Sequence, residues 1–228
     1  MSVSTELRLE GDKGLFVART DEPDLRRALR ALAFTEQHGV FVRSFPADAP
    51  GLHESYVRFK RTVDDVLAQA AGRCLPPWEE ALDAVAERLE LLRAEWFLVG
   101  SGALAARGIE VVPRELDLVV SDPSVAAESF GHAQIEPVSV NRPGRWIARW
   151  FGRAFVHARV EWVADVDPAI DTYAAPNDYG PEAASRLEAV RWRDHELQLA
   201  PLDLALAVSE RRGLTARAAA IRDYLGSS

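Results

Sequence analysis

The stretch that decides the fold of this chain is WFLVGSGALAARGIEVVPRELDLVVSD, residues 96–122. It begins with an apolar run, Phe97 to Val99, that predicts a buried strand, and Gly100-Ser101-Gly102 follows where a strand would turn into a helix. Ala103 to Arg107 is strong helix-forming sequence, and Gly108 stands where the end of a helix favours a residue without a Cβ atom. The pattern predicts a strand, a turn and a short helix in direct succession.

A second strand is predicted where Glu115 and Asp117 alternate with Leu116 and Leu118. Side chains two apart on a strand point to the same face. We therefore expect the two carboxylates to project together, close to the Gly-Ser turn. Such an arrangement can place a divalent metal ion against a nucleoside triphosphate.

The combination resembles the signature of the nucleotidyltransferase superfamily, an apolar residue and Gly-Ser followed, after a gap, by an acid–apolar–acid–apolar strand. Here it reads Val99-Gly100-Ser101, thirteen residues, then Glu115-Leu116-Asp117-Leu118. More narrowly, the chain is similar to small bacterial nucleotidyltransferase-like proteins near the AbiEii-type toxins. That similarity runs over roughly residues 77–225 and includes RVEWV at 159–163, PLDL at 201–204 and ERRGL at 210–214.

The resemblance implies an α/β (α+β) fold, in which a nucleotidyltransferase-like mixed sheet with flanking helices and a C-terminal helical pair follows a small α/β domain. It also implies Mg²⁺-dependent transfer of a nucleoside monophosphate from an NTP substrate to a hydroxyl acceptor. The acceptor would be a tRNA end, as in toxin–antitoxin systems with an antitoxin partner, or a small molecule. The alternative is a catalytically inactive nucleotidyltransferase fold that serves in binding or in a complex.

Three acids are the candidate catalytic residues and ligands for Mg²⁺ or Mn²⁺, namely Glu115, Asp117 and, on a neighbouring predicted strand, Glu161. Glu161 would complete the metal site and orient or deprotonate the attacking hydroxyl. A charged residue between apolar neighbours is costly to bury unless it is paired or bound to a metal. The alternative for these acids is an ion pair with Arg114 or with an arginine of residues 142–159.

Phosphate is expected to bind at Gly100 and Ser101, because glycine permits close backbone approach and the following helix N-terminus offers unpaired N–H groups. Residues 141–159 add five arginines and no acid. Arg149 and Arg153, with Arg145, fall four residues apart on the polar side of a helix predicted over 145–152, and they are candidates to bind the triphosphate or an RNA acceptor. A solvated helix face is the alternative for this segment.

Two features depart from the family pattern. The first acid is usually Asp, and the extra methylene of Glu115 moves its carboxylate by roughly 1.5 Å, which is large beside a Mg–O distance of about 2.1 Å. AbiEii-type toxins share a lysine on a later helix, whereas this chain has no lysine after Lys60. Arg211 or Arg212 would replace that lysine in charge but not in shape.

The whole sequence sets the domain organisation. Its 228 residues are enough for one large or two small domains, and the Pro76-Pro77 linker divides it into 1–74, a small accessory domain, and 77–228. The net charge of −8 lies outside the balanced first 75 residues. One cysteine excludes an intrachain disulfide, and neither a membrane span nor a secretory signal is visible, so we expect a cytoplasmic protein. The oligomeric state is left open.

The first domain is expected to contain three short strands and two helices, and we expect it to pack on the second domain or to restrict what enters it. In the second domain we expect an edge strand over 134–140, one strand over 155–163, a hairpin over 187–199 and two final helices. The predicted elements of the first domain are strands at 7–9, 15–18 and 39–42 and helices from 23 and over 52–71.

Overall fold

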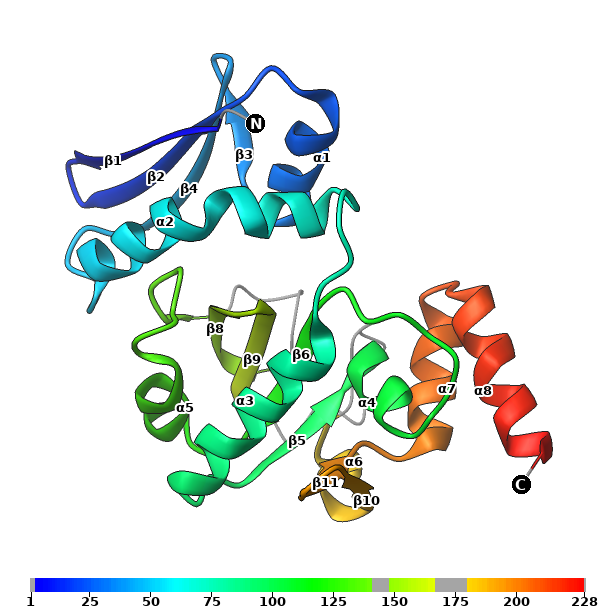
Figure 1. The fold of residues 1–228 in the computed structure, drawn as a ribbon. Helices are drawn as coiled ribbons and strands as arrows, with labels where there is room; N and C mark the ends of the chain where they lie inside the picture. Colours follow the sequence, from blue (N-terminus) through cyan, green and yellow to red (C-terminus); the bar gives the residue numbers. More distant parts are fainter. Residues whose placement is uncertain (1–2, 141–147, 167–179, 228) are drawn as a thin grey trace.

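The computed structural model describes residues 3–140, 148–166 and 180–227 of the chain, and it contains two β-sheets (Figure 1). The first sheet has four strands and is formed before residue 47. The second has seven strands and is formed by residues 96–199. The α/β class with a mixed sheet, flanking helices and a preceding small α/β unit is confirmed.

The N-terminal sheet has the order β1-β2-β4-β3 and is antiparallel throughout. Its core gathers the apolar faces of two helices against Phe16 and Phe41, and Phe59 stacks between Phe16 and Phe34. Strand β3 was not predicted, because its three residues are all exposed and show no apolar alternation. The elements are β1 (Ser4–Glu10), β2 (Lys13–Arg19), α1 (Pro23–Ala31), β3 (Thr35–Gln37), β4 (Val40–Pro46) and α2 (Leu52–Ala70).

The second sheet has the order β10-β11-β5-β6-β9-β8-β7, with parallel pairing only between β11 and β5 and between β6 and β9. The predicted C-terminal helical pair is present as α7 and α8. The elements are α3 (Trp78–Leu91), β5 (Trp96–Val99), α4 (Gly100–Ala106), β6 (Leu116–Val120), α5 (Pro123–Phe130), β7 (Ser139–Val140), β8 (Ala148–Val156), β9 (Ala158–Val166), α6 (Gly180–Ser185), β10 (Glu188–Trp192), β11 (His195–Leu199), α7 (Leu202–Arg211) and α8 (Thr215–Ser227).

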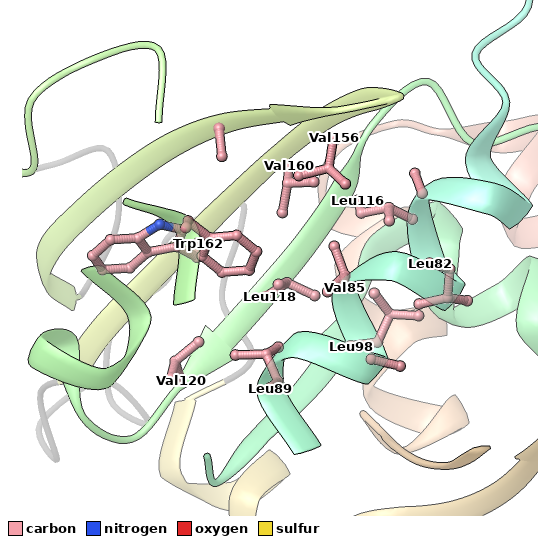
Figure 2. Packing of buried hydrophobic residues seen from close by; sticks show 14 of the residues in the cluster. Leu82, Val85, Leu89, Leu98, Leu116, Leu118, Val120, Val156, Val160 and Trp162 are labelled. Atoms are coloured by element: carbon pink, nitrogen blue, oxygen red, sulfur yellow. The ribbon is translucent and has the colours of Figure 1, made fainter. Parts of the chain in front are cut away.

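One face of the second sheet carries the main core. Leu116, Leu118 and Val120 alternate along β6 and meet the apolar stripe of α3, and Trp162 of β9 is completely buried (Figure 2). Because side chains alternate along a strand, Asp117 and Val119 must project to the opposite face. The alternation that builds the core therefore sets the acids apart from it.

Two predictions around β8 and β9 were wrong. The segment predicted as a helix over 145–152 is a strand from Ala148 onward, and the single strand predicted over 155–163 is a hairpin that turns at His157. His157 has a φ of 58°, a left-handed conformation that lets the chain reverse. Pairing of β8 with β9 along nearly their full lengths outweighs the local helical spacing of the arginines.

The predicted edge strand over 134–140 is shorter than expected. Only Ser139–Val140 forms β7, and Gln134 adds an isolated bridge to Ala154. The predicted hairpin over 187–199 is present as β10 and β11. Within the described part of the chain, no helix is long and apolar enough to cross a membrane.

The two sheets meet where α2 and the β8–β9 hairpin come together (Figure 1). Ile135 and Phe155 of the second unit pack into the N-terminal core, and the side-chain amide of Gln69 donates a 2.8 Å hydrogen bond to the carbonyl of His157. Packing of the first unit on the second is thus observed. The boundary at 74–77 as a division into domains stays a prediction.

Candidate active site

Four adjacent strands bring one row of residues across the second sheet. Val99 of β5 pairs with Asp117 of β6, Asp117 pairs with Glu161 of β9, and Glu161 pairs with Arg153 of β8. Residues paired directly across neighbouring strands point to the same face. Asp117 and Glu161 therefore stand side by side on the face opposite the main core, as the sequence predicted.

Gly100 follows Val99 directly and begins α4 with a φ of 66°, in the left-handed region that favours glycine. A Cβ atom at this position would lie 2.7 Å from Oδ2 of Asp117, closer than real contacts allow. The Gly-Ser turn and the acid strand are thus in contact, as the spacing in the sequence predicted. Ser101 is the next residue of α4 and is buried.

Asp117 has an unusual electrostatic environment. Burial raises the pKa of its carboxyl well above the ordinary value, the charges of Glu115 and Glu161 raise it further, and those of Arg159 and Arg217 oppose them. Among the residues that the structure describes, the Asp117 carboxylate makes no hydrogen bond and no ion pair. A cation bound here would relieve the repulsion among the three acids.

Glu115 lies one residue before β6, and its carboxylate forms an ion pair with Arg159 of β9. The same arginine approaches Glu161, with Nε 3.2 Å from Oε1, and Arg153 donates a 2.9 Å hydrogen bond to that oxygen. Burial alone would raise the pKa of Glu161, but the charges of Arg153 and Arg159 outweigh it, and the pKa is lowered. The alternative of ion pairs with arginines of the 142–159 segment is thus realised for both glutamates.

The three acids share one neighbourhood, but they do not form a ready metal cage. Within the described ranges, no group of three His, Cys, Asp or Glu side chains is placed to hold a metal ion. Asp117 fits a hard cation in donor type, and its carboxylate is unpartnered. Glu115 and Glu161 fit in donor type, but both carboxylates are paired with the guanidinium of Arg159.

Arg153 is held inside a network that crosses to the N-terminal unit. Its Nη1 lies 2.5 Å from the carboxylate of Glu136 and donates a 3.1 Å hydrogen bond to the carbonyl of Leu32, and Arg43 of β4 binds the other oxygen of Glu136 at 2.7 Å. The side chains of Arg153 and Glu136 are only 5% and 3% exposed. These contacts favour a structural role for Arg153, and its predicted binding of nucleotide stays a prediction.

The other predicted arginines lie elsewhere. Arg149 lies on β8, four residues before Arg153, and it is exposed. Its guanidinium covers the ring of Trp150 and lies 3.8 Å from the carboxylate of Asp165. Arg145 lies outside the described residues. The structure therefore does not bring Arg149 to the acid row.

Three charged residues that connect to the acids, Arg217, Glu136 and Arg43, were not predicted from the sequence. The charge of Arg217 in α8 acts on Asp117, and Arg217 has no ion-pair partner in the described part of the chain. Arg211 and Arg212, which were considered as replacements for the family's lysine, are exposed. Glu136 and Arg43 anchor Arg153. A signal existed for Glu136, which stands between Ile135 and Pro137, and a weaker one for Arg43, which follows the apolar run Val40 to Val42.

No protein-family model matches the sequence, and no curated protein matches it either. Among solved structures, the chain is similar to one described as a "putative nucleotidyltransferase" from Thermotoga maritima, with a TM-score of 0.50 and 15% sequence identity. The match covers 68% of this chain and 97% of the other. At this identity the likeness concerns the fold alone, and it agrees with the nucleotidyltransferase-like architecture expected from the sequence.

Proposed function

We propose that this protein transfers a nucleoside monophosphate from an NTP to a hydroxyl acceptor. The observation that carries the proposal is the carboxylate of Asp117, which has no partner among the described residues and lies against Gly100 and next to Glu161 on the face opposite the main core. Phosphoryl chemistry of this kind needs positioned reactants and neutralised charge more than a covalent group from the protein. In this proposal the acid row would position the reactants, and the cations around it would neutralise charge.

A divalent ion, Mg²⁺ or Mn²⁺, would be held by Asp117 together with Glu115 and Glu161, and it would neutralise charge on the triphosphate. The backbone of Gly100 and Ser101 would bind a phosphate at the start of α4. Arg217 would bind a phosphate oxygen, because its charge acts on Asp117 and it has no ion-pair partner among the described residues. Glu161 would orient the acceptor hydroxyl.

The acceptor is proposed to be a tRNA end, or alternatively a small molecule, in a toxin–antitoxin setting with an antitoxin as partner. What supports this finer proposal is the resemblance of the sequence to the AbiEii-type group. If the acceptor is a tRNA end, a labelled nucleotide should be transferred from one of the NTPs to bulk tRNA.

A second candidate function is binding without catalysis. It is favoured by Arg159, which occupies the space between Glu115 and Glu161 and neutralises both carboxylates. Replacement of the usual first Asp by Glu115 also agrees with loss of a metal site. In this case the fold serves as a binding or complex-forming module.

The decisive experiment incubates the protein with each α-labelled NTP, Mg²⁺ or Mn²⁺ and bulk tRNA, alongside Asp117→Asn. Asn keeps the shape of the side chain but removes its charge, so we expect transfer to fall at least about a hundredfold. Asp194→Asn is the matched control, because Asp194 is fully exposed at the β10–β11 turn. Its activity should equal that of the unmodified protein.

Binding of Mn²⁺ and nucleotide, followed by calorimetry, separates the two candidates. Transfer that depends on Asp117 supports the enzyme. Absence of transfer together with absence of Asp117-dependent binding of metal and nucleotide would falsify it and leave the non-catalytic module.

A further inference from the structure

A cavity of about 230 Å³ lies away from the acid row, between the two units of the molecule. Its walls come from α2, from α3, from the segment after α5 and from the β8–β9 turn. The cavity is smaller than the roughly 300–1,000 Å³ of pockets for drug-sized ligands, so a compact group suits it. Its lining includes Arg58, Arg61, Arg88, His132 and His157.

Half of the lining residues are arginines or histidines, and no carboxylate is among the lining residues. Arg58 and Arg61 project from α2 of the N-terminal unit, and Arg88 projects from α3 across from them. In the ranges that the structure describes, none of the three forms an ion pair. The charge of Glu87 acts on Arg88 from outside the lining, but no lining carboxylate neutralises the three guanidinium groups, so an anion that enters the cavity would meet positive charge from both units.

His132 adds a hydrogen-bond donor to the lining. Its Nδ1 lies 3.2 Å from Nη1 of Arg88. A guanidinium can only donate, so Nδ1 accepts, the ring is neutral and Nε2 carries the proton. Burial, and then the charges of Arg88 and Arg58, lower the pKa of His132, which is consistent with a neutral ring.

From this geometry we infer that the cavity is a binding site for a single phosphate group of a phosphate ester, held by Arg58, Arg61 and Arg88. Arginine is suited to this role because its planar fork binds two phosphate oxygens at once. The net charge of −8 disfavours contact with a long polyanion, so one defined phosphate fits better than a broad nucleic-acid surface.

The site is separate from the acid row and does not rest on the proposed function. His157 precedes Glu161 by four residues, which at about 3.3 Å per residue is roughly 13 Å along the strand direction. The cavity also needs α2, so it exists only because the N-terminal unit packs against the hairpin tip. Each unit supplies part of the anion site, so the packing of the two units would be needed for binding.

The test is calorimetric titration of the full-length protein at low salt with inorganic phosphate, ribose 5-phosphate and a 5′-phosphorylated RNA tetramer. We expect saturable binding that weakens at least about tenfold in Arg88→Gln and in the Arg58→Gln/Arg61→Gln double variant. Arg27→Gln is the matched control, because Arg27 is an exposed arginine of α1 outside the cavity. It should bind within about twofold of the unmodified protein.

Asp117→Asn should leave ribose 5-phosphate binding unchanged, so failure at the acid row and failure here are distinguishable. Tighter binding of the RNA, with a salt slope reduced by about one in Arg88→Gln, identifies a polynucleotide as the source of the phosphate. Equal binding of the RNA and ribose 5-phosphate identifies a small phosphorylated molecule. No saturable binding of any probe, or binding that the arginine variants leave unchanged while their denaturation curves match the control, overturns the inference.

Discussion

At the scale of single residues, the contact between Gly100 and Asp117 joins the turn to the acid strand. Gly100 is constrained twice, by its left-handed backbone and by the carboxylate that occupies the space of a Cβ atom. Gly108, at the other end of α4, has a φ of 83° but open space around it. Comparison of the two glycines therefore distinguishes the cost of backbone strain from the cost of contact with the Asp117 carboxylate.

We predict that Gly100→Ala destabilises the protein more than Gly108→Ala. Backbone strain costs about 1–2 kcal/mol in each variant, and contact with Asp117 adds roughly 1 kcal/mol at position 100 only. Urea denaturation measures both free energies of unfolding. In an Asp117→Ala background the two glycine variants should cost the same, and an undiminished difference there would contradict the account.

Asp24 gives a pH-dependent prediction at the same scale. The hydrogen bond from Arg73 lowers the pKa of the Asp24 carboxyl to about 2. Because the pKa is lower in the folded protein than in the unfolded chain, the contribution of this pair to stability is present above the unfolded pKa. It is lost as the pH falls through the folded pKa.

Carbon-13 NMR of labelled aspartate side chains should therefore show Asp24 titrating with a midpoint near 2. Arg73→Gln should move the midpoint up toward the ordinary value of about 3.9, while Arg191→Gln leaves it in place. An unchanged midpoint in Arg73→Gln would show that another interaction stabilises the Asp24 carboxylate.

At the scale of elements, the register of the β8–β9 hairpin determines which side chains lie on each face of the sheet. Its register sets Gly152 opposite Trp162 on the core face and Arg153 opposite Glu161 on the site face. A Cβ atom at Gly152 would lie 2.1 Å from the ring of Trp162, which is completely buried and has no room to move. The glycine is thus required by packing rather than by a turn.

Gly152→Ala is predicted to destabilise the protein by ~3 kcal/mol, because overpacking of a filled core forces the ring or the strand to shift. Thermal and urea denaturation measure the change. Gly226→Ala, in α8 with open space around it, should be neutral or slightly stabilising. If Gly152→Ala lowers the free energy of unfolding no more than Gly226→Ala does, the pairing of Gly152 with Trp162 would be contradicted.

At the scale of the whole molecule, a buried ionic network ties the two units together. Glu136 binds Arg43 of the N-terminal sheet on one side and Arg153 of the second sheet on the other. Arg153 in turn binds Glu161 of the acid row. Contacts across the unit boundary are therefore connected to the candidate site through fixed side chains.

Glu136→Gln is predicted to destabilise the protein by about 3–5 kcal/mol, because it removes the anion shared by two buried guanidinium groups. The matched control is Glu6→Gln, whose ion pairs with Arg8 and Arg19 are exposed and screened by solvent, so we expect a much smaller loss of stability. Urea denaturation followed by circular dichroism gives both values. Similar losses in the two variants would show that the buried network contributes little.

The sequence was sufficient wherever local patterns carry the information. Alternation along β6 separated Asp117 from its apolar neighbours, the Gly-Ser turn was located beside it, and the helix predicted over 52–71 is present as α2. It failed at β8, where Arg149 and Arg153 are spaced as on a helix yet belong to a strand. Spacing cannot reveal a strand whose formation depends on pairing with a neighbour along its full length.

The sequence by itself determined the α/β class and the nearness of Asp117 to Gly100, since strand periodicity and backbone conformation act over a few residues. Only the tertiary structure decided which partners these acids meet. Arg159, Arg217 and the Arg43–Glu136 link reach the site from distant segments, and the cationic cavity needs α2 and α3 together. Burial and charge act through space, so they are fixed only when the sheets and helices pack.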